Sequence, residues 1–218
     1  MKMSMGLVAV VAVLATPLVG AAQDAELSAN VGVVSEYFYR GIFQKGSSAS
    51  AGLDLAVGNV YLGTWAADVG DGNEVDLYAG YGTEIDDFSV SVGGTAYLYT
   101  GDFDQTYLEG NLNAGYKAIS AEFSYGRHDL VQAVPADPEN ETYWFLSATV
   151  EEAGLYATFG AFGKDLGGEY YEAGYSVSVG ELDLSAAWIY STEDLPFQTA
   201  DDHTIVFSIS HTFGIDIE

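Results

Sequence analysis

Apolar and polar residues alternate along most of the chain, in segments of about ten residues that are separated by turn-forming residues. In residues 88–92, for example, Phe88, Val90 and Val92 share one face, while Ser89 points to the other. A period of two is the geometry of a β-strand, and no helical period follows residue 23. The pattern predicts about twelve strands, in the segments 27–40, 51–57, 60–67, 75–82, 88–99, 108–116, 119–126, 143–150, 155–162, 171–179, 182–190 and 204–213.

The connections between these segments alternate in length. Short turns are expected at 58–59, 83–87, 117–118, 151–153 and 180–181. Longer loops, rich in acidic residues and glycine, are expected at 41–50, 68–73, 100–107, 127–141, 163–169 and 191–203. Short turns at one end and longer loops at the other are typical of an outer-membrane barrel, whose short turns face the periplasm. An even number of strands then places both termini in the periplasm.

Aromatic residues gather at both ends of the apolar face, as the two headgroup interfaces of a membrane select. The outer girdle is expected to hold Tyr37, Tyr39, Tyr125, Tyr171, Trp188 and Tyr190, and the periplasmic girdle Tyr81, Phe88, Tyr116 and Phe213. A soluble β-sandwich also alternates, but it buries its apolar face and is not expected to carry aromatics at both ends. The sequence therefore predicts an all-β fold, a closed antiparallel transmembrane β-barrel, because closure pairs every backbone polar group within the hydrocarbon.

The first 22 residues are predicted to form a secretory signal peptide. Lys2 supplies the positive charge, residues 6–14 are apolar, and small residues at 20–22 precede a cleavage site before Gln23. The apolar run is well short of the roughly 20 residues that a transmembrane helix needs. The barrel is therefore expected to comprise residues 23–218 and to lie in the outer membrane of a Gram-negative bacterium.

The composition excludes several kinds of function. The chain has 32 acidic and 6 basic residues, and its formal net charge of −26 argues against nucleic-acid binding, which needs a lysine- and arginine-rich surface. It has no cysteine, so a disulfide scaffold, a thiolate metal site and a cysteine nucleophile are all excluded. Yet 49% of the residues are hydrophobic, which is not the composition of a disordered acidic chain.

Three stretches, in this order along the chain, carry a family resemblance. They read VSEYFYRG at 34–41, GTWAA at 63–67 and EVDLYAGY at 74–81. In these stretches the sequence resembles the family of TorF-type porins, which are small outer-membrane proteins of proteobacteria. The resemblance runs over most of 27–213 and implies an outer-membrane barrel with a pore. The sequence departs from the family at 47–50, where a proline is usual, and in the residues that follow Phe213.

The polar face of the predicted strands carries most of the charged residues that could line a pore. These residues are expected to be Glu36, Arg40, Asp54, Glu74, Asp76, Glu109, Glu122, Arg127, Glu172 and Asp183. Charged rings of this kind set ion selectivity through the local potential, and an acidic excess favours cations. Alternatively, Arg40 and Arg127 pair with carboxylates and seal the barrel, since a barrel of about twelve strands is only modestly wider than one that side chains fill.

A catalytic site is not expected. The three histidines, His128, His203 and His211, fall at loop edges or on the lipid-facing phase, and no short motif ties one of them to a serine. The acidic segments 68–74 and 102–104 do not have the ligand spacing of an EF-hand loop. The sequence therefore predicts neither a metal site nor a cofactor.

The function expected from these features is passive diffusion of small hydrophilic solutes or cations through a narrow acidic lumen. Two alternatives remain at this point. The first is a plugged structural barrel that contacts partners through acidic loops, and the second, weaker one is a hydrolase at the outer rim. The expected partners are outer-membrane lipid and small solutes or ions.

Overall fold

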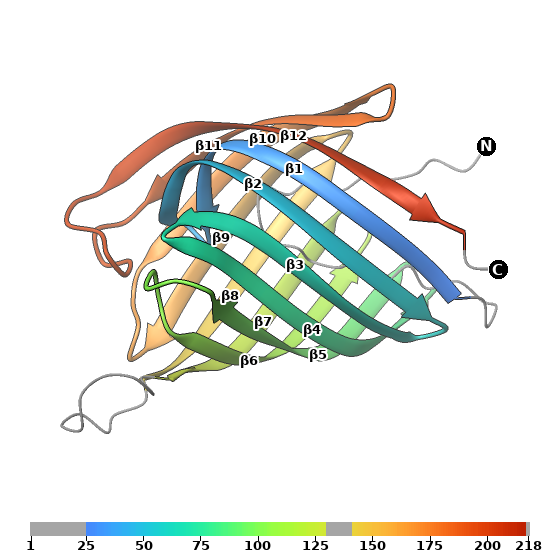
Figure 1. The fold of residues 1–218 in the computed structure, drawn as a ribbon, viewed down its shortest axis with the longest axis horizontal. Coiled ribbons are helices and arrows are strands. Elements are labelled where there is room, and N and C mark those ends of the chain that lie inside the picture. Colours follow the sequence, from blue (N-terminus) through green and yellow to red (C-terminus); the bar gives the residue numbers. More distant parts are fainter. Residues whose placement is uncertain (1–24, 130–140, 217–218) are drawn as a thin grey trace.

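The computed structural model describes residues 25–129 and 141–216, and within them the chain forms a closed barrel of twelve antiparallel strands (Figure 1). The all-β barrel predicted from the sequence is thereby confirmed; the predicted signal peptide, residues 1–22, lies outside the described residues. The strands are β1 (Ala25–Tyr39), β2 (Ile42–Val57), β3 (Val60–Gly70), β4 (Gly72–Ile85), β5 (Phe88–Tyr99), β6 (Thr106–Tyr116), β7 (Ile119–Asp129), β8 (Glu141–Glu152), β9 (Leu155–Lys164), β10 (Glu169–Val179), β11 (Leu182–Ser191) and β12 (Asp202–Ile215).

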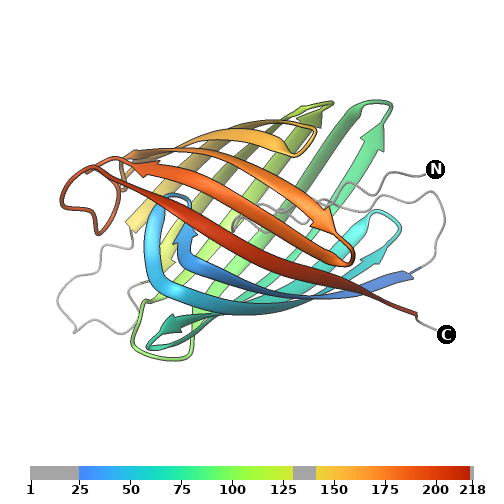
Figure 2. The same cartoon turned by 90° about the horizontal axis from the view of Figure 1, so that it is seen from above.

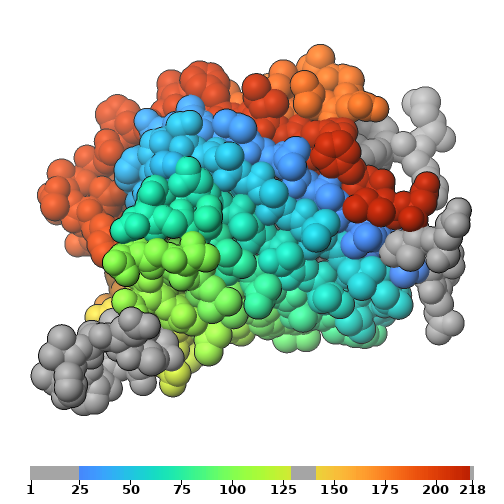
Figure 3. Space-filling view, in the orientation of Figure 1, coloured from blue at the N-terminus to red at the C-terminus, as the bar shows by residue number. Residues whose placement is uncertain are grey.

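The barrel closes where β1 pairs with β12. Residues 27–34 of β1 lie opposite residues 208–215 of β12, and each other strand pairs with its neighbours in the sequence. Closure removes the unpaired strand edges that would otherwise expose backbone N–H and C=O groups. Figure 3 shows the side chains of β1 to β5 forming a continuous outer wall on this side of the barrel.

The two ends of the barrel differ, and we name them for their connections. The turn end carries five two-residue turns, at 58–59, 86–87, 117–118, 153–154 and 180–181. The loop end carries the other connections, and the longest described one is the β11–β12 loop, residues 192–201. The first and last described residues lie at the turn end (Figures 1 and 2).

Two of the predicted loops are wrong. Residues 41–50 belong largely to β2, and residues 68–73 extend β3 and β4. The β1–β2 connection is therefore the pair Arg40-Gly41 alone, with φ of 49° and 78°. Positive φ at both central residues is the geometry of the tightest β-hairpin turns.

The loop-end part of the first hairpin leaves the barrel wall. In the described strand pairings, β1 pairs with β12 no further than Val34, and β2 pairs with β3 only from Ser50 onward. Residues 35–49, which we call the inner hairpin, continue the pairing of β1 with β2, with a shift in register between Tyr37 and Phe38. Figure 2 shows β1 and β2 curling away from the wall at this end.

The inner hairpin is packed against the inside of the barrel on both of its faces. Phe38 contacts Ala187, Ile189 and Val206 on β11 and β12. Tyr37 lies on the other face, with its ring centroid 5.9 Å from that of Trp65 on β3. Near the turn, Ile42 packs into a further buried cluster with Tyr143, Phe145, Phe162, Tyr170 and Leu195. The hairpin therefore extends from the β1–β2 side of the barrel to the wall formed by β8, β9 and β10.

The outer face of the barrel is apolar, with aromatic residues near both ends. Eight of the ten predicted girdle residues are on this face: Tyr81, Phe88, Tyr116, Tyr125, Tyr171, Trp188, Tyr190 and Phe213. The placement of Tyr37 and Tyr39 in the outer girdle is wrong, because the chain leaves the barrel wall after Val34 and both faces of the inner hairpin lie inside the barrel. No helix within the described residues is long and apolar enough to cross a membrane.

We expect Gly41→Ala to destabilise the barrel far more than the matched substitution Gly58→Ala. Both glycines have a positive φ, so each substitution carries a backbone cost of about 1–2 kcal/mol. A Cβ atom at Gly41 would lie 2.4 Å from Cβ of Tyr170, whereas one at Gly58 would meet nothing within 4 Å. The clash adds about 1–3 kcal/mol at Gly41. Urea unfolding of the two variants in detergent micelles measures this difference, and equal losses would contradict the packing of the hairpin.

Candidate functional site

A buried ion-pair cluster holds the turn of the inner hairpin. Arg40 is 6% exposed and its guanidinium forms a two-pronged contact with Glu109 on β6, through Nη1 to Oε1 at 2.6 Å and Nη2 to Oε2 at 3.0 Å. Nη2 also donates to Oε1 of Glu122 on β7, at 2.6 Å. The guanidinium carbon lies 4.1 Å from the ring centroid of Phe145. One cation is thereby shared between two carboxylates of the opposite wall.

Neutral donors complete the coordination of the two carboxylates. Glu109 accepts hydrogen bonds from the Tyr143 hydroxyl at 2.7 Å and the Asn111 amide at 3.0 Å, and Glu122 accepts one from the Ser124 hydroxyl at 2.7 Å. A buried ion pair is stable when such additional bonds satisfy its remaining lone pairs. Removing one member leaves an uncompensated buried charge, at a cost of about 3–5 kcal/mol.

A second pair of carboxylates lies under the inner hairpin on β4. Glu74 is 1% exposed and accepts hydrogen bonds from the hydroxyls of Tyr37 and Tyr99. Asp76 is 9% exposed, and its Oδ1 has no hydrogen-bond partner among the described residues. The hairpin therefore covers both groups in the arrangement that the structure shows.

The remaining predicted pore residues with a carboxylate also face the interior of the barrel. Each accepts a hydrogen bond from one or two neutral donors: Glu36 from Thr204, Asp54 from Asn30 and Tyr78, Glu172 from Tyr156, and Asp183 from Ser178. These four acceptors come from four strands, β1, β2, β10 and β11, so negative charge is not confined to the ion-pair cluster and β4.

The inward placement of Arg127 is wrong. On β7, Glu122 and Ser124 are buried inside, while Phe123 and Tyr125 are exposed on the outer face. Arg127 is exposed, shares the phase of the two aromatic residues and pairs with Leu108 in register, which is also exposed. The predicted strand ended at residue 126, but β7 continues to Asp129, so residue 127 keeps the alternation of the strand and points outward.

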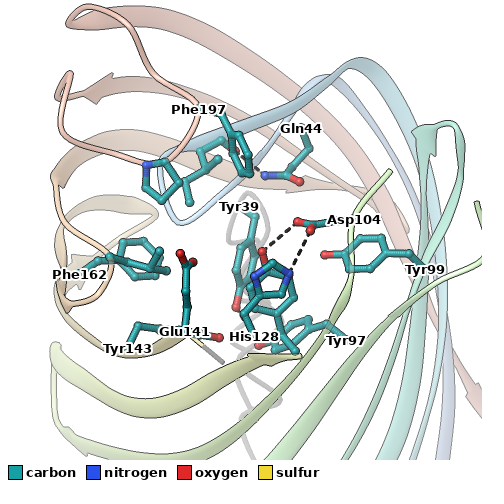
Figure 4. Close-up of a pocket in the computed structure, with 14 residues that line it drawn as sticks. Tyr39, Gln44, Tyr97, Tyr99, Asp104, His128, Glu141, Tyr143, Phe162 and Phe197 are labelled. Atoms are coloured by element: carbon teal, nitrogen blue, oxygen red, sulfur yellow. Dashed lines mark hydrogen bonds and ion pairs between the residues drawn. The ribbon is translucent and has the colours of Figure 1, made fainter. Parts of the chain in front are cut away.

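The loop end of the barrel holds a cavity of about 280 Å³, which we call the tyrosine cavity (Figure 4). The inner hairpin and the inner faces of β5 to β9 contribute most of its lining. The lining residues are Tyr39, Ile42, Gln44, Tyr97, Tyr99, Asp104, Tyr107, His128, Glu141, Tyr143, Phe162, Leu166, Pro196 and Phe197.

The β11–β12 loop covers part of this cavity. Leu195 is 2% exposed and packs on Ile42, which brings the next two residues, Pro196 and Phe197, to the cavity. The base of the loop is fixed by Asp201, which accepts hydrogen bonds from the Tyr190 hydroxyl at 2.6 Å and the Glu193 amide at 2.9 Å. These two bonds lower the pKa of Asp201 below its ordinary value.

Sequence reasoning missed the tyrosine cavity, although a signal was present. Tyr97 and Tyr99 alternate with apolar residues on the inward phase of their strand, where polar side chains of small size prevail elsewhere. Large aromatic rings on that phase indicate a filled or shaped interior near the loop end. Their convergence with residues of the inner hairpin depends on the departure of that hairpin from the wall after Val34, which periodicity does not show.

The described residues show no arrangement typical of a metal site. No group of three or more histidine, aspartate or glutamate side chains among them is placed to hold a metal ion. Of the histidines, His128 lies in the cavity with Nε2 3.3 Å from Oδ1 of Asp104, and His211 packs on Phe213 at the other end.

Comparison with solved structures gives distant matches to membrane barrels. A protein solved in a study of the in-meso crystallization of membrane proteins is 10% identical, with a TM-score of 0.63 over 88% of this chain and 85% of that one. The NanC porin, in a rhombohedral crystal form, is 10% identical, with a TM-score of 0.56 over 87% of this chain and 100% of that one. Likeness at this identity establishes the barrel fold.

The sequence itself places the chain in a family. No curated protein matches it. A family model described as a bacterial protein of unknown function, Gcw_chp, matches residues 19–213 and therefore most of the barrel. The chain belongs to the Gcw_chp family of bacterial proteins.

Proposed function

We propose that this protein is a narrow porin-like channel of the Gram-negative outer membrane, in which the inner hairpin limits the passage of small hydrophilic solutes or cations. Its turn end and both termini face the periplasm, in line with the short turns there. The observation that carries this proposal is a polar lumen that one anchored hairpin crosses at the loop end. The fold likeness to the NanC porin supports it.

The lumen away from the hairpin is lined by small polar side chains and by the rings of Tyr61, Tyr78 and Tyr156, which lie over the inward positions of Gly80, Gly63 and Gly174. Ser185 and Ser208 are in hydrogen-bond contact at 2.6 Å, as are Thr149 and Thr158 at 2.8 Å. Side chains of this size fill less of a barrel than the leucine and isoleucine of a packed core. A twelve-strand barrel with such a lining has room for water, which passive diffusion requires.

The charge of the lumen favours cations over anions. Its carboxylates come from β1, β2, β4, β6, β7, β10 and β11, while Arg40 contributes a single positive charge that two of them share. Net negative charge along a narrow path raises the local concentration of cations and repels anions. The likeness to TorF-type porins noted from the sequence belongs to the same proposal.

One observation favours a second candidate function. The inner hairpin contacts β3, β6, β7 and β11, so it crosses the loop-end half of the lumen with buried contacts on both faces. A barrel sealed in this way would act through its loop end rather than by conduction. The two functions differ in whether release of the hairpin opens an ion path.

We expect Arg40→Ala to raise the conductance of the barrel in a planar lipid bilayer. Without the guanidinium, nothing neutralises Glu109 and Glu122 and their repulsion favours displacement of the hairpin turn. Single-channel currents should increase several-fold over those of the unaltered protein. Arg127→Ala is the matched control, because that side chain is exposed on the outer face and its loss should leave the currents unchanged.

Arg40→Ala alone leaves two buried carboxylates without a cation and could prevent folding, so a second variant without unpaired charges is needed. In Arg40→Ala combined with Glu109→Gln and Glu122→Gln, all three charges of the cluster are removed together. Heat-dependent mobility on a gel establishes that each variant forms a barrel before the currents are recorded. Folded variants whose currents do not exceed those of the unaltered protein would contradict a hairpin that limits passage. If the unaltered protein and the folded variants are all silent, the channel is contradicted and the sealed barrel is favoured.

A further prediction concerns ion selectivity. In the Arg40→Ala background, replacing Glu74 with Gln and Asp76 with Asn should shift the reversal potential in a salt gradient toward zero. The reason is that both carboxylates lie beneath the hairpin and face the path that its displacement opens. An unchanged reversal potential would show that these two residues do not act as the cation filter.

A further inference from the structure

The tyrosine cavity is not required by diffusion through the lumen. Its walls come from β5, β6, β7, β8 and β9, its floor from the inner hairpin, and part of its cover from the β11–β12 loop (Figure 4). At about 280 Å³ it has nearly the size of known small-molecule pockets, which begin at about 300 Å³. Seven of its lining residues are aromatic.

The aromatic side chains are held in fixed positions by their own contacts. The hydroxyls of Tyr39 and Tyr97 are 2.7 Å apart, and the ring of Tyr107 lies edge-on to that of Tyr143, with the centroids 6.2 Å apart. The ring of Tyr107 also stacks on that of His128, with centroids 4.1 Å apart. A site of this kind is largely formed before a ligand arrives, which lowers the entropic cost of binding.

The cavity combines these rings with carboxylates, and the titratable base among its described lining residues is His128, whose Nε2 lies 3.3 Å from Oδ1 of Asp104. Asp104 accepts a hydrogen bond from the Tyr107 hydroxyl at 2.9 Å, and the Glu141 side chain reaches the cavity from the start of β8. No lysine or arginine is among its described lining residues. Both the faces of aromatic rings and the two carboxylates attract positive charge, and the carboxylates repel anions.

We propose that the tyrosine cavity binds a small organic cation, a quaternary or protonated amine with an apolar body. The aromatic rings would contact the alkyl groups and the charge of the amine, as aromatic cages do for quaternary ammonium groups. Asp104 and Glu141 would supply the opposite charge. The cavity is complete in the structure with the hairpin in place, so this inference holds whether or not the barrel conducts.

Phe197 is the aromatic residue best suited to test the site. Its side chain is 82% exposed, it lies in the β11–β12 loop, and Figure 4 shows it at the edge of the cavity. Because it makes few contacts with the rest of the barrel, its replacement tests the cavity without a large loss of packing. Glu141, also exposed, offers the same advantage for the charge.

The experiment is titration calorimetry of the refolded protein in detergent with choline and with its uncharged isostere, 3,3-dimethylbutan-1-ol. Choline should bind at least ten-fold more tightly than the isostere. Phe197→Leu keeps the apolar surface without the ring and should weaken choline binding about three- to ten-fold, while Phe197→Tyr should not. Glu141→Gln should also weaken it, and Glu84→Gln, an exposed carboxylate at the turn end, serves as the matched control.

Three outcomes would overturn the proposal. Equal affinity for choline and the isostere would show an apolar cavity that does not recognise charge. Tighter binding of glucose than of choline would assign the rings to sugar recognition. No binding of choline by the folded barrel would remove the site altogether. A barrel that binds choline but does not conduct would contradict the proposed channel and support this inference. A barrel that conducts but does not bind choline would support the channel and contradict this inference.

Discussion

The buried charge of Arg40 is the constraint on which the interior of this barrel depends. A guanidinium that is 6% exposed is stable only where carboxylates and further hydrogen-bond partners surround it, and Glu109 and Glu122 lie on the wall opposite the strand that carries it. The hairpin turn must therefore reach across the lumen. The two positive φ angles at Arg40-Gly41 and the close approach of Gly41 to Tyr170 follow from that requirement.

The crossing divides the interior into two parts with different chemistry. Toward the turn end, hydroxyl groups of serine, threonine and tyrosine together with scattered carboxylates give the interior a polar lining. Toward the loop end, the hairpin is the floor of a cavity lined by aromatic rings. A solute that entered from the loop end would meet the rings first, then the ion-pair cluster, and then the polar lumen. Under the two proposals, a single hairpin serves both as a barrier and as part of a binding surface.

Alternation of residues was sufficient to predict the barrel, because a strand that separates lipid from lumen must place apolar and polar side chains on opposite faces. The same rule failed where the chain leaves the wall. Tyr37, Phe38 and Tyr39 are all inside, since the hairpin has left the wall after Val34 and both of its faces pack against the interior. The segment 41–50 has the glycine and serine residues of a loop, yet most of it pairs as part of β2. Contacts such as that between Arg40 and Glu122 join residues 82 positions apart, and no local pattern encodes them.

The position of the hairpin can be measured directly as a distance across the barrel. Because β2 and β8 are six strands apart in the ring of twelve, residues 44 and 141 would be separated by a full barrel diameter if β2 continued along the wall. The structure instead places Gln44 and Glu141 on the same cavity. The chain has no cysteine, so spin labels can be attached at Gln44→Cys and Glu141→Cys alone and their separation measured by pulsed electron resonance. A single short distance is the result that a crossing hairpin gives, and a distance equal to the barrel diameter would contradict it.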